Sequence, residues 1–307
     1  RACDAERIDA LAEVGFNRAS LGVQDHNPKV QEAIHREQPY EMTRQTVEQL
    51  RESGFGSINF DLIYGLPEQT PESFRRTIDD VLELHPDRIA VYSYAHVPWM
   101  HPAQKHLERA GLPEASTKLD LLKGTIERLT DAGFVYIGLD HFAHPEDDLA
   151  KAFDNGTLRR NFQGYSTHRE TDIHAMGMSG ISQTSDMYFQ NAKELDDYRG
   201  ALRDGGLPVV RGCTLSDDDR IRRRTIMHVM CRSELDFEEM SDELGVDFAE
   251  YFADDLERLA PLEEDGLVSV DSEGVDITPV GRLFLRIIAR EFDAYLDHDE
   301  NRYSKSV

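Results

Sequence analysis

Ala5-Glu-Arg-Ile-Asp-Ala-Leu-Ala-Glu-Val-Gly15-Phe-Asn-Arg-Ala-Ser-Leu-Gly-Val-Gln24 is the stretch that indicates the fold class of this 307-residue chain. Residues 5–14 place apolar side chains at helical spacing, and Gly15 suits the end of a helix. Residues 18–24 then follow with the pattern of a short buried strand. A helix, a glycine and a strand form the second half of a β-α-β unit. The stretch therefore predicts an α/β protein with a parallel sheet.

The same alternation continues to about residue 150. Four such strands do not close a barrel, and an open parallel half-sheet would expose an apolar edge. We therefore expect residues 1–150 to be the C-terminal part of a parallel, TIM-like β/α barrel, in a chain truncated at its N-terminus. A self-sufficient open sheet is the alternative. Further helices are predicted over 28–53, from Thr70 onward and over 116–132, and further strands over 57–63, 88–94 and 134–139.

The pattern changes after residue 150. Residues 151–210 are predicted to form short helices and loops, as a connecting segment that packs on the barrel mouth. Residues 211–307 are predicted to form a mostly helical domain with a β-hairpin over 266–278, an arrangement similar to a winged helix. We expect this domain to pack against the barrel, because an acidic chain does not suit DNA.

Charge and cysteine content exclude several classes of protein. The net charge of −25 argues against nucleic acid or an anionic membrane as a partner. No apolar run approaches the roughly 20 residues that span a bilayer. Cys3, Cys213 and Cys231 have the spacing of neither a disulfide framework nor a metal site. We expect a soluble cytoplasmic protein with reduced thiols and no metal ligands in this chain.

Polar residues stand at the predicted strand ends, where parallel α/β proteins carry their functional groups. Asp61 is the sharpest case, because aspartate suits a strand poorly and is costly to bury unpaired. A salt bridge to a nearby arginine is the structural alternative. The histidines of the rim could also indicate a metal hydrolase, but their spacing is not that of a metal site. The strand-end residues are Gln24, Asp25, Asp61, Tyr94, Ala95, His96, Asp140 and His141.

A set of short motifs, in order along nearly the whole chain, resembles the oxygen-independent coproporphyrinogen III oxidases. These are radical S-adenosylmethionine enzymes of haem biosynthesis. The motifs are Ser20-Leu-Gly-Val-Gln-Asp25, Arg36-Glu-Gln38, Asp61-Leu-Ile-Tyr-Gly-Leu-Pro67, Gln69-Thr-Pro-Glu-Ser-Phe74, Tyr94-Ala-His96, Asp140-His-Phe-Ala143, Arg160-Asn-Phe-Gln-Gly-Tyr165 and Gly177-Met-Ser-Gly-Ile-Ser182.

The resemblance implies an activity and a site. A [4Fe-4S] cluster would reduce S-adenosylmethionine, and the resulting radical would drive oxidative decarboxylation of coproporphyrinogen III to protoporphyrinogen IX. It further implies two molecules of S-adenosylmethionine, an external electron donor and a monomer. The positions that match the family's S-adenosylmethionine-binding residues are Gln24, Arg36, Asp61, Ala95 and Ile181.

One family feature is absent from the chain, namely the Cys-x-x-x-Cys-x-x-Cys motif that binds the cluster. We expect the cluster ligands and the catalytic residues to lie upstream of residue 1, and the chain alone to be inactive. A related haem-delivery chaperone and a catalytically inert scaffold are the alternatives. The segment from Arg160 to Tyr165 favours the oxidase, because the chaperones lack its Asn-Phe-Gln-Gly-Tyr sequence.

Overall fold

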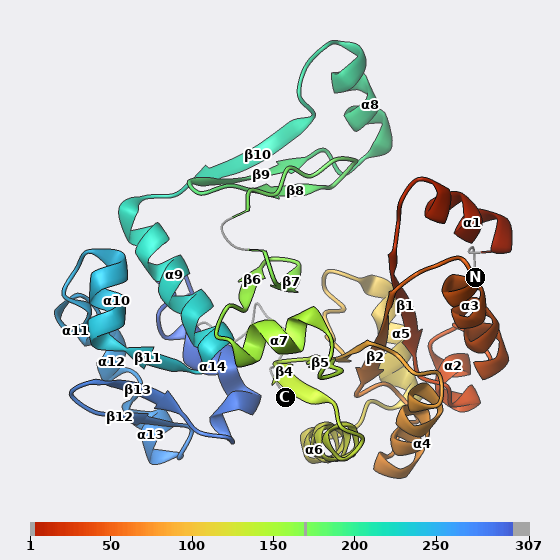
Figure 1. Ribbon diagram of the computed structural model, residues 1–307, viewed down its shortest axis with the longest axis horizontal. Helices are drawn as coiled ribbons and strands as arrows, with labels where there is room; N and C mark the ends of the chain where they lie inside the picture. Colours follow the sequence, from red (N-terminus) through yellow and green to blue (C-terminus); the bar gives the residue numbers. More distant parts are fainter. Residues whose placement is uncertain (1–3, 169–170, 297–307) are drawn as a thin grey trace. The chain divides into compact units, whose positions relative to one another are not determined.

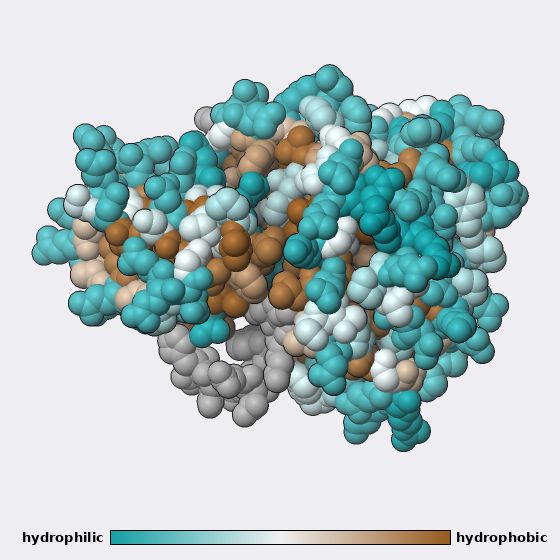
Figure 2. All heavy atoms as spheres, turned by 90° about the horizontal axis from the view of Figure 1, so that it is seen from below, coloured by the Kyte–Doolittle hydropathy of each residue, from teal (hydrophilic) through white to brown (hydrophobic). Residues whose placement is uncertain are grey.

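The computed structural model describes residues 4–168 and 171–296, and its contacts divide the chain into two compact units. The first unit extends to Asp154 and the second begins at Asn155 (Figure 1). Hydrophilic side chains cover most of the face drawn in Figure 2, as expected for a chain in which 30% of the residues are charged. No helix in the described ranges is both long enough and apolar enough to cross a membrane.

The first unit is built on a five-stranded sheet with the order β1-β2-β3-β5-β4. Strands β1, β2 and β3 are parallel, as predicted. Gly22 of β1 lies opposite Asp61 of β2, and Asp61 lies opposite Ala90 of β3. The strands are β1 (Arg18–Gln24), β2 (Ser57–Tyr64), β3 (Arg88–Ser93), β4 (Val135–Gly138) and β5 (His141–Ala143).

The fourth predicted strand differs from expectation. We expected residues 134–139 to continue the parallel sheet, but among the described strands β4 pairs only with β5, which inserts antiparallel between β3 and β4. The chain reverses at Gly138 and Leu139, whose φ angles are 141° and 53°. Because the chain reverses here, β5 rather than β4 is the strand that pairs with β3.

Helices follow the strands of the first unit. The predicted helical region 28–53 is in fact two helices, because α2 ends near His35, which has a φ of 54°, and Pro39 precedes α3. Helix α4 begins with a capping box between Thr70 and Ser73 and with proline at its first position. The helices are α1 (Ala5–Glu13), α2 (Pro28–Ala33), α3 (Tyr40–Glu52), α4 (Pro71–Leu82), η1 (Pro102–Gln104), α5 (Lys105–Ala110), α6 (Ala115–Asp131) and α7 (Asp148–Asp154).

The two faces of the sheet differ in polarity. Along β2, alternate residues Ile58, Phe60 and Leu62 are fully buried in the hydrophobic core. The residues between them, including Asn59 and Asp61, are only partly buried. Since successive side chains of a strand point to opposite faces, the polar residues share the face that is turned away from this core.

The first part of the second unit contains short antiparallel strands as well as helix α8 and loops, whereas only short helices and loops were predicted for residues 151–210. A hairpin is followed by a three-stranded antiparallel sheet, and β10 leads from α8 back toward α9 (Figure 1). Strands of only three residues are too short to show a reliable alternation. The elements are β6 (Arg159–Asn161), β7 (Gly164–Ser166), β8 (Ile181–Gln183), β9 (Met187–Asn191), α8 (Leu195–Arg203) and β10 (Val209–Thr214).

The remainder of the second unit is helical, with a small antiparallel sheet of order β11-β13-β12. The predicted hairpin is present as β12 and β13, while β11 was missed because it has three residues and directly follows the left-handed Ser233 at the end of α9. That residues 151–210 pack on the barrel mouth, and that residues 211–307 pack against the barrel, stays a prediction. The elements are α9 (Asp217–Arg232), β11 (Glu234–Asp236), α10 (Phe237–Leu244), α11 (Phe248–Tyr251), α12 (Ala253–Glu257), α13 (Ala260–Glu264), β12 (Val268–Val270), β13 (Gly274–Ile277), η2 (Gly281–Phe284) and α14 (Leu285–Arg290).

Candidate functional site

The centre of the candidate site is Gly22, over which two long polar side chains meet. The guanidinium of Arg36 donates a hydrogen bond of 2.7 Å from Nη2 to the carbonyl oxygen of Gly22. A Cβ atom at position 22 would lie 2.7 Å from Nε2 of Gln24 and 3.4 Å from Nη2 of Arg36. Glycine is therefore required here for Gln24 and Arg36 to lie side by side at the end of β1.

Two polar atoms at this place are buried and have no hydrogen-bond partner among the described residues. They are Oε1 of Gln24, an acceptor, and Nε of Arg36, a donor. Buried polar groups are almost always satisfied, so such a pair indicates a ligand or ordered water. An arginine beside an amide suits a ligand that carries a carboxylate, which arginine binds bidentately, together with hydroxyl or ammonium donors.

Asp61 lies next to this pair, because its strand places it opposite Gly22. Its Oδ2 accepts a hydrogen bond of 2.8 Å from the hydroxyl of Ser20, and its Oδ1 accepts one of 2.8 Å from the amide of Asn59. The described residues include no salt bridge to Asp61, so its hydrogen-bond partners are neutral and the alternative of a salt bridge to an arginine is wrong. Ser20 and Asn59 were not predicted to belong to the site, although the two-residue period of strands places both on the face of Asp61.

Asp25, which directly follows β1, is fully buried. Its carboxylate accepts hydrogen bonds from the hydroxyl of Thr77 at 2.6 Å, the amide of Gln69 at 2.7 Å and the backbone of Asn27 at 2.7 Å. Burial raises the pKa of Asp25 above its usual value, and these hydrogen bonds oppose that rise. Asp25 thus serves the structure of the strand end rather than the ligand, a distinction that its position in the sequence does not reveal.

Ala95 and Ile181 stand apart from this cluster. Ala95 is exposed just after β3, and its carbonyl oxygen accepts a 3.0 Å hydrogen bond from Gln104. Ile181 begins β8 in the second unit, where it lies opposite Gln190 of β9. Within the first unit, the structure therefore brings together Gln24, Arg36 and Asp61. The assignment of all five residues to ligand binding stays a prediction.

Histidines that follow the strands of the first unit are hydrogen-bonded to neighbouring side chains. His96 bonds to Tyr94 through Nδ1 at 3.3 Å and to Glu108 through Nε2 at 2.7 Å, while Nε2 of His35 lies 2.8 Å from Nε2 of His106. Within the described ranges, no group of three or more histidine, cysteine, aspartate or glutamate side chains is placed to hold a metal ion. The described cysteines are Cys213, exposed on β10, and Cys231, buried in α9, and these do not fit a cluster.

Two family models match the chain, namely the radical SAM superfamily over residues 2–81 and the HemN C-terminal domain over residues 215–284. Among solved structures, coproporphyrinogen III oxidase (HemN) from Escherichia coli, described as a radical SAM enzyme, is similar with a TM-score of 0.92 and 47% identity. That match covers 96% of this chain and 68% of the solved one. The fold is therefore that of a radical SAM protein, and the predicted class of a partial barrel with a C-terminal domain is confirmed.

Curated relatives define the family more narrowly. The oxygen-independent coproporphyrinogen III oxidase of Pseudomonas aeruginosa is 47% identical over all of this chain, and that of Thermostichus vulcanus is 44% identical over 96% of it. The chain belongs to the oxygen-independent coproporphyrinogen III oxidase family. It spans 67% of the length of the P. aeruginosa protein, 65% of the E. coli protein and 91% of the T. vulcanus protein.

Proposed function

We propose that the protein acts in the oxygen-independent oxidative decarboxylation of coproporphyrinogen III to protoporphyrinogen IX, in haem biosynthesis. Membership of the oxidase family supports the reaction. The buried Oε1 of Gln24 and Nε of Arg36, which have no hydrogen-bond partner among the described residues, support a ligand site beside Gly22 in the first unit. S-Adenosylmethionine, reduced by a [4Fe-4S] cluster, would supply the radical that removes hydrogen from the propionate side chains.

The residues of the first unit have separate roles in this proposal. Arg36 binds the methionine carboxylate, because its Nε is available while its Nη2 is held by Gly22. Gln24 accepts a hydrogen bond from the ligand through Oε1. Asp61 accepts hydrogen bonds from hydroxyl or ammonium groups, for which Ser20 and Asn59 hold its carboxylate in place. Ala95 and Ile181 contribute a backbone group and an apolar wall.

The described residues do not offer a ligand set that fits the cluster itself. Coproporphyrinogen III and an electron donor are the proposed partners, and a monomer is the proposed state. The proposed location is the cytoplasm, because the exposed free thiol of Cys213 suits a reducing compartment.

The test is calorimetric titration of S-adenosylmethionine into the full-length protein. Arg36→Ala and Asp61→Ala should each weaken binding about ten- to a hundredfold, because hydrogen bonds to charged groups contribute about 1.5–3 kcal/mol. Arg76→Ala is the matched control, since Arg76 is exposed on α4 and pairs only with Glu72 among the described residues. A thermal melt of each variant separates lost affinity from lost stability.

The proposal fails if both variants fold well, bind S-adenosylmethionine like the parent and convert coproporphyrinogen III at the parent rate. A loss of stability with unchanged affinity in the folded molecules would instead make Arg36 and Asp61 structural residues.

A further inference from the structure

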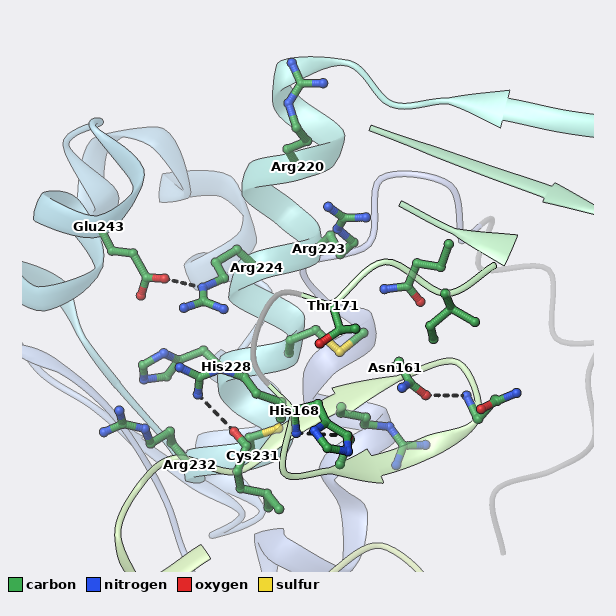
Figure 3. A pocket seen from close by; sticks show the side chains of 18 of the residues that line it. Asn161, His168, Thr171, Arg220, Arg223, Arg224, His228, Cys231, Arg232 and Glu243 are labelled. Carbon is green, nitrogen blue, oxygen red and sulfur yellow. Dashed lines mark hydrogen bonds and ion pairs between the residues drawn. The ribbon is translucent and has the colours of Figure 1, made fainter. Parts of the chain in front are cut away.

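The second unit contains a cavity of about 750 Å³ that is lined by an unusual concentration of positive charge. It lies along α9 and beside the β6–β7 hairpin, with Arg224 and His228 on the helix and Asn161 on the hairpin (Figure 3). Two glutamates, Glu239 and Glu243, are its only acidic lining residues within the described ranges. Its arginines are Arg159, Arg160, Arg220, Arg223, Arg224 and Arg232.

This concentration is opposite to the character of the chain, whose net charge is −25. Part of it is neutralised within the protein. Arg224 forms an ion pair with Glu243, and Arg220 forms one with Asp217 at the start of α9. Arg232 is more weakly paired, because its Nη2 lies 3.9 Å from Glu239 and its buried Nε has no hydrogen-bond partner in the described part of the chain.

Arg160 and Arg223 have no carboxylate partner among the described residues. The guanidinium of Arg160 lies 4.9 Å from the centre of the Tyr165 ring, and its Nη1 is buried without a hydrogen-bond partner. The guanidinium of Arg223 lies 5.8 Å from the centre of the Tyr188 ring and donates to the carbonyl oxygens of Thr184 and Ser185. Cation–π contacts with tyrosine rings help to orient both guanidiniums in the absence of an anion.

His228 also lines the cavity, among these arginines and the two glutamates. Burial lowers the pKa of His228, and the neighbouring Arg232 lowers it further. Its Nε2 is buried and has no hydrogen-bond partner in the described ranges. The cavity therefore offers fixed positive charge together with a neutral imidazole, and apolar surface comes from Leu158, Ile173 and Met227.

From this arrangement we infer that the cavity binds a ligand with several carboxylates on an apolar body, with Arg160 and Arg223 as direct carboxylate contacts. Resting on the proposed function, the ligand is coproporphyrinogen III and the carboxylates are those of its propionate side chains. The volume is within the range of about 300–1,000 Å³ that is usual for small-molecule sites. Arg160 on β6 and Arg223 on α9 lie on different elements, which suits carboxylates at different edges of one ligand.

The experiment uses the full-length protein and coproporphyrin III, the stable oxidised form of the substrate, followed by fluorescence titration. Arg160→Gln and Arg223→Gln should each weaken binding about ten- to a hundredfold, since each removes charged hydrogen bonds. The tetramethyl ester of coproporphyrin III, which has the same ring but no free carboxylates, should bind weakly to the parent and equally weakly to the variants. Titration with S-adenosylmethionine should give parent affinity in every variant.

Two controls separate binding from folding. Arg203→Gln removes an exposed arginine from α8 in the same unit and should leave porphyrin affinity unchanged. The melting temperature of each variant is measured beside its affinity, because Arg223→Gln loses the hydrogen bonds to the carbonyl oxygens of Thr184 and Ser185. Titration at a temperature where every variant is folded makes a loss of affinity a loss of binding.

Parent-like affinity of both variants for coproporphyrin III, or tight binding of the ester, overturns the inference. The proposed function is judged separately by conversion of coproporphyrinogen III in the parent protein. If the parent fails to convert it while the arginine variants lose porphyrin affinity, the site stands and the reaction does not.

Discussion

Oδ2 of Asp25 accepts a 2.7 Å hydrogen bond from Nε2 of Gln69, which lies 44 residues further along the chain. The same amide nitrogen donates to the carbonyl oxygen of Ile63 at 2.8 Å, and Oε1 of Gln69 accepts from the backbone of Leu66 at 2.9 Å. One glutamine therefore joins the end of β1 to the loop that follows β2. Because Gln24 and Asp61 lie on these two strands, the link sets their relative positions.

Replacement of Gln69 by leucine should loosen this link. Asp25 would lose one donor and the Leu66 amide its acceptor, and buried unsatisfied groups cost about 1–3 kcal/mol each. We expect a fall in the free energy of unfolding of that order, together with weaker S-adenosylmethionine binding. Gln45→Leu on the exposed side of α3 is the control, and chemical denaturation of both variants is the measurement. Equal stability of the two would contradict the role of the link.

Gly22→Ala should weaken ligand binding without a large loss of stability. The new Cβ would lie 2.7 Å from Nε2 of Gln24 and 3.4 Å from Nη2 of Arg36, so these flexible side chains must move. We expect about a tenfold loss of S-adenosylmethionine affinity, equivalent to about 1.4 kcal/mol. Gly56→Ala, where a Cβ meets nothing within 4 Å, should bind like the parent. Calorimetric titration of S-adenosylmethionine into Gly22→Ala and Gly56→Ala is the measurement. Equal affinities of the two variants would show that Gly22 is not part of the site.

His26 should make the first unit sensitive to acid. Burial lowers the pKa of His26 from 6.5 to about 4, and Asp80, whose carboxylate lies 3.7 Å from Nδ1, is too distant for a hydrogen bond that would offset this. A base with a lowered folded pKa binds fewer protons in the folded state than in the unfolded state. Its contribution to stability is therefore complete above pH 6.5 and is lost as the pH falls toward 4.

We expect this loss to be at most roughly 3–4 kcal/mol, because a tenfold difference in proton affinity between the folded and unfolded states is equivalent to about 1.4 kcal/mol. His26→Phe keeps an aromatic ring beside Tyr40 and removes the titrating group. Urea denaturation between pH 4.5 and 7 should show a smaller pH dependence for His26→Phe than for the parent, whereas the exposed His101→Gln should follow the parent. Identical pH dependence in all three proteins would show that His26 does not titrate as described.

The described cysteines should not be cluster ligands. The buried thiol of Cys231 has its pKa raised to about 11 by burial, so it stays protonated at neutral pH, and Cys213 is exposed on a different element. Cys3 lies outside the described residues. After anaerobic reconstitution with iron and sulfide, the double variant Cys213→Ser, Cys231→Ser should hold as much cluster as the parent by absorbance. A stoichiometric cluster that is lost on Cys213→Ala would refute this.

Long, periodic segments of the fold could be predicted from the sequence, while short ones could not. Strand β1 has the bounds that its pattern predicted, and α4 begins where Thr70 and Pro71 indicated. Strands β6 and β8 have three residues each, so their pairing depends on partners that are distant in the sequence. The position of β5 could not be predicted from the sequence either, because it depends on a backbone reversal at Gly138 and Leu139.

The candidate site was predictable in kind but not in detail. A polar residue within an apolar strand identified Asp61, yet only the strand register shows that Gly22 is its neighbour. The arginine cavity had a visible signal in Arg220-Ile-Arg-Arg-Arg224, a basic run in an acidic chain. A basic run on a helix is usually a solvated face. Only the three-dimensional structure shows that Arg220 and Arg224 pair with carboxylates while Arg223 has no carboxylate partner among the described residues.

The two neutral donors on Asp61 affect how the site responds to substitution. Ser20 and Asn59 fix the rotation of the carboxylate, so its conformational freedom is lost during folding rather than during binding. A glutamate would carry the same charge on a longer and more mobile side chain, and neither Ser20 nor Asn59 could hold it in the same orientation. If Asp61 binds ligand as proposed, selectivity at this position depends on conformational entropy as well as on charge, and a rigid β2 is part of recognition.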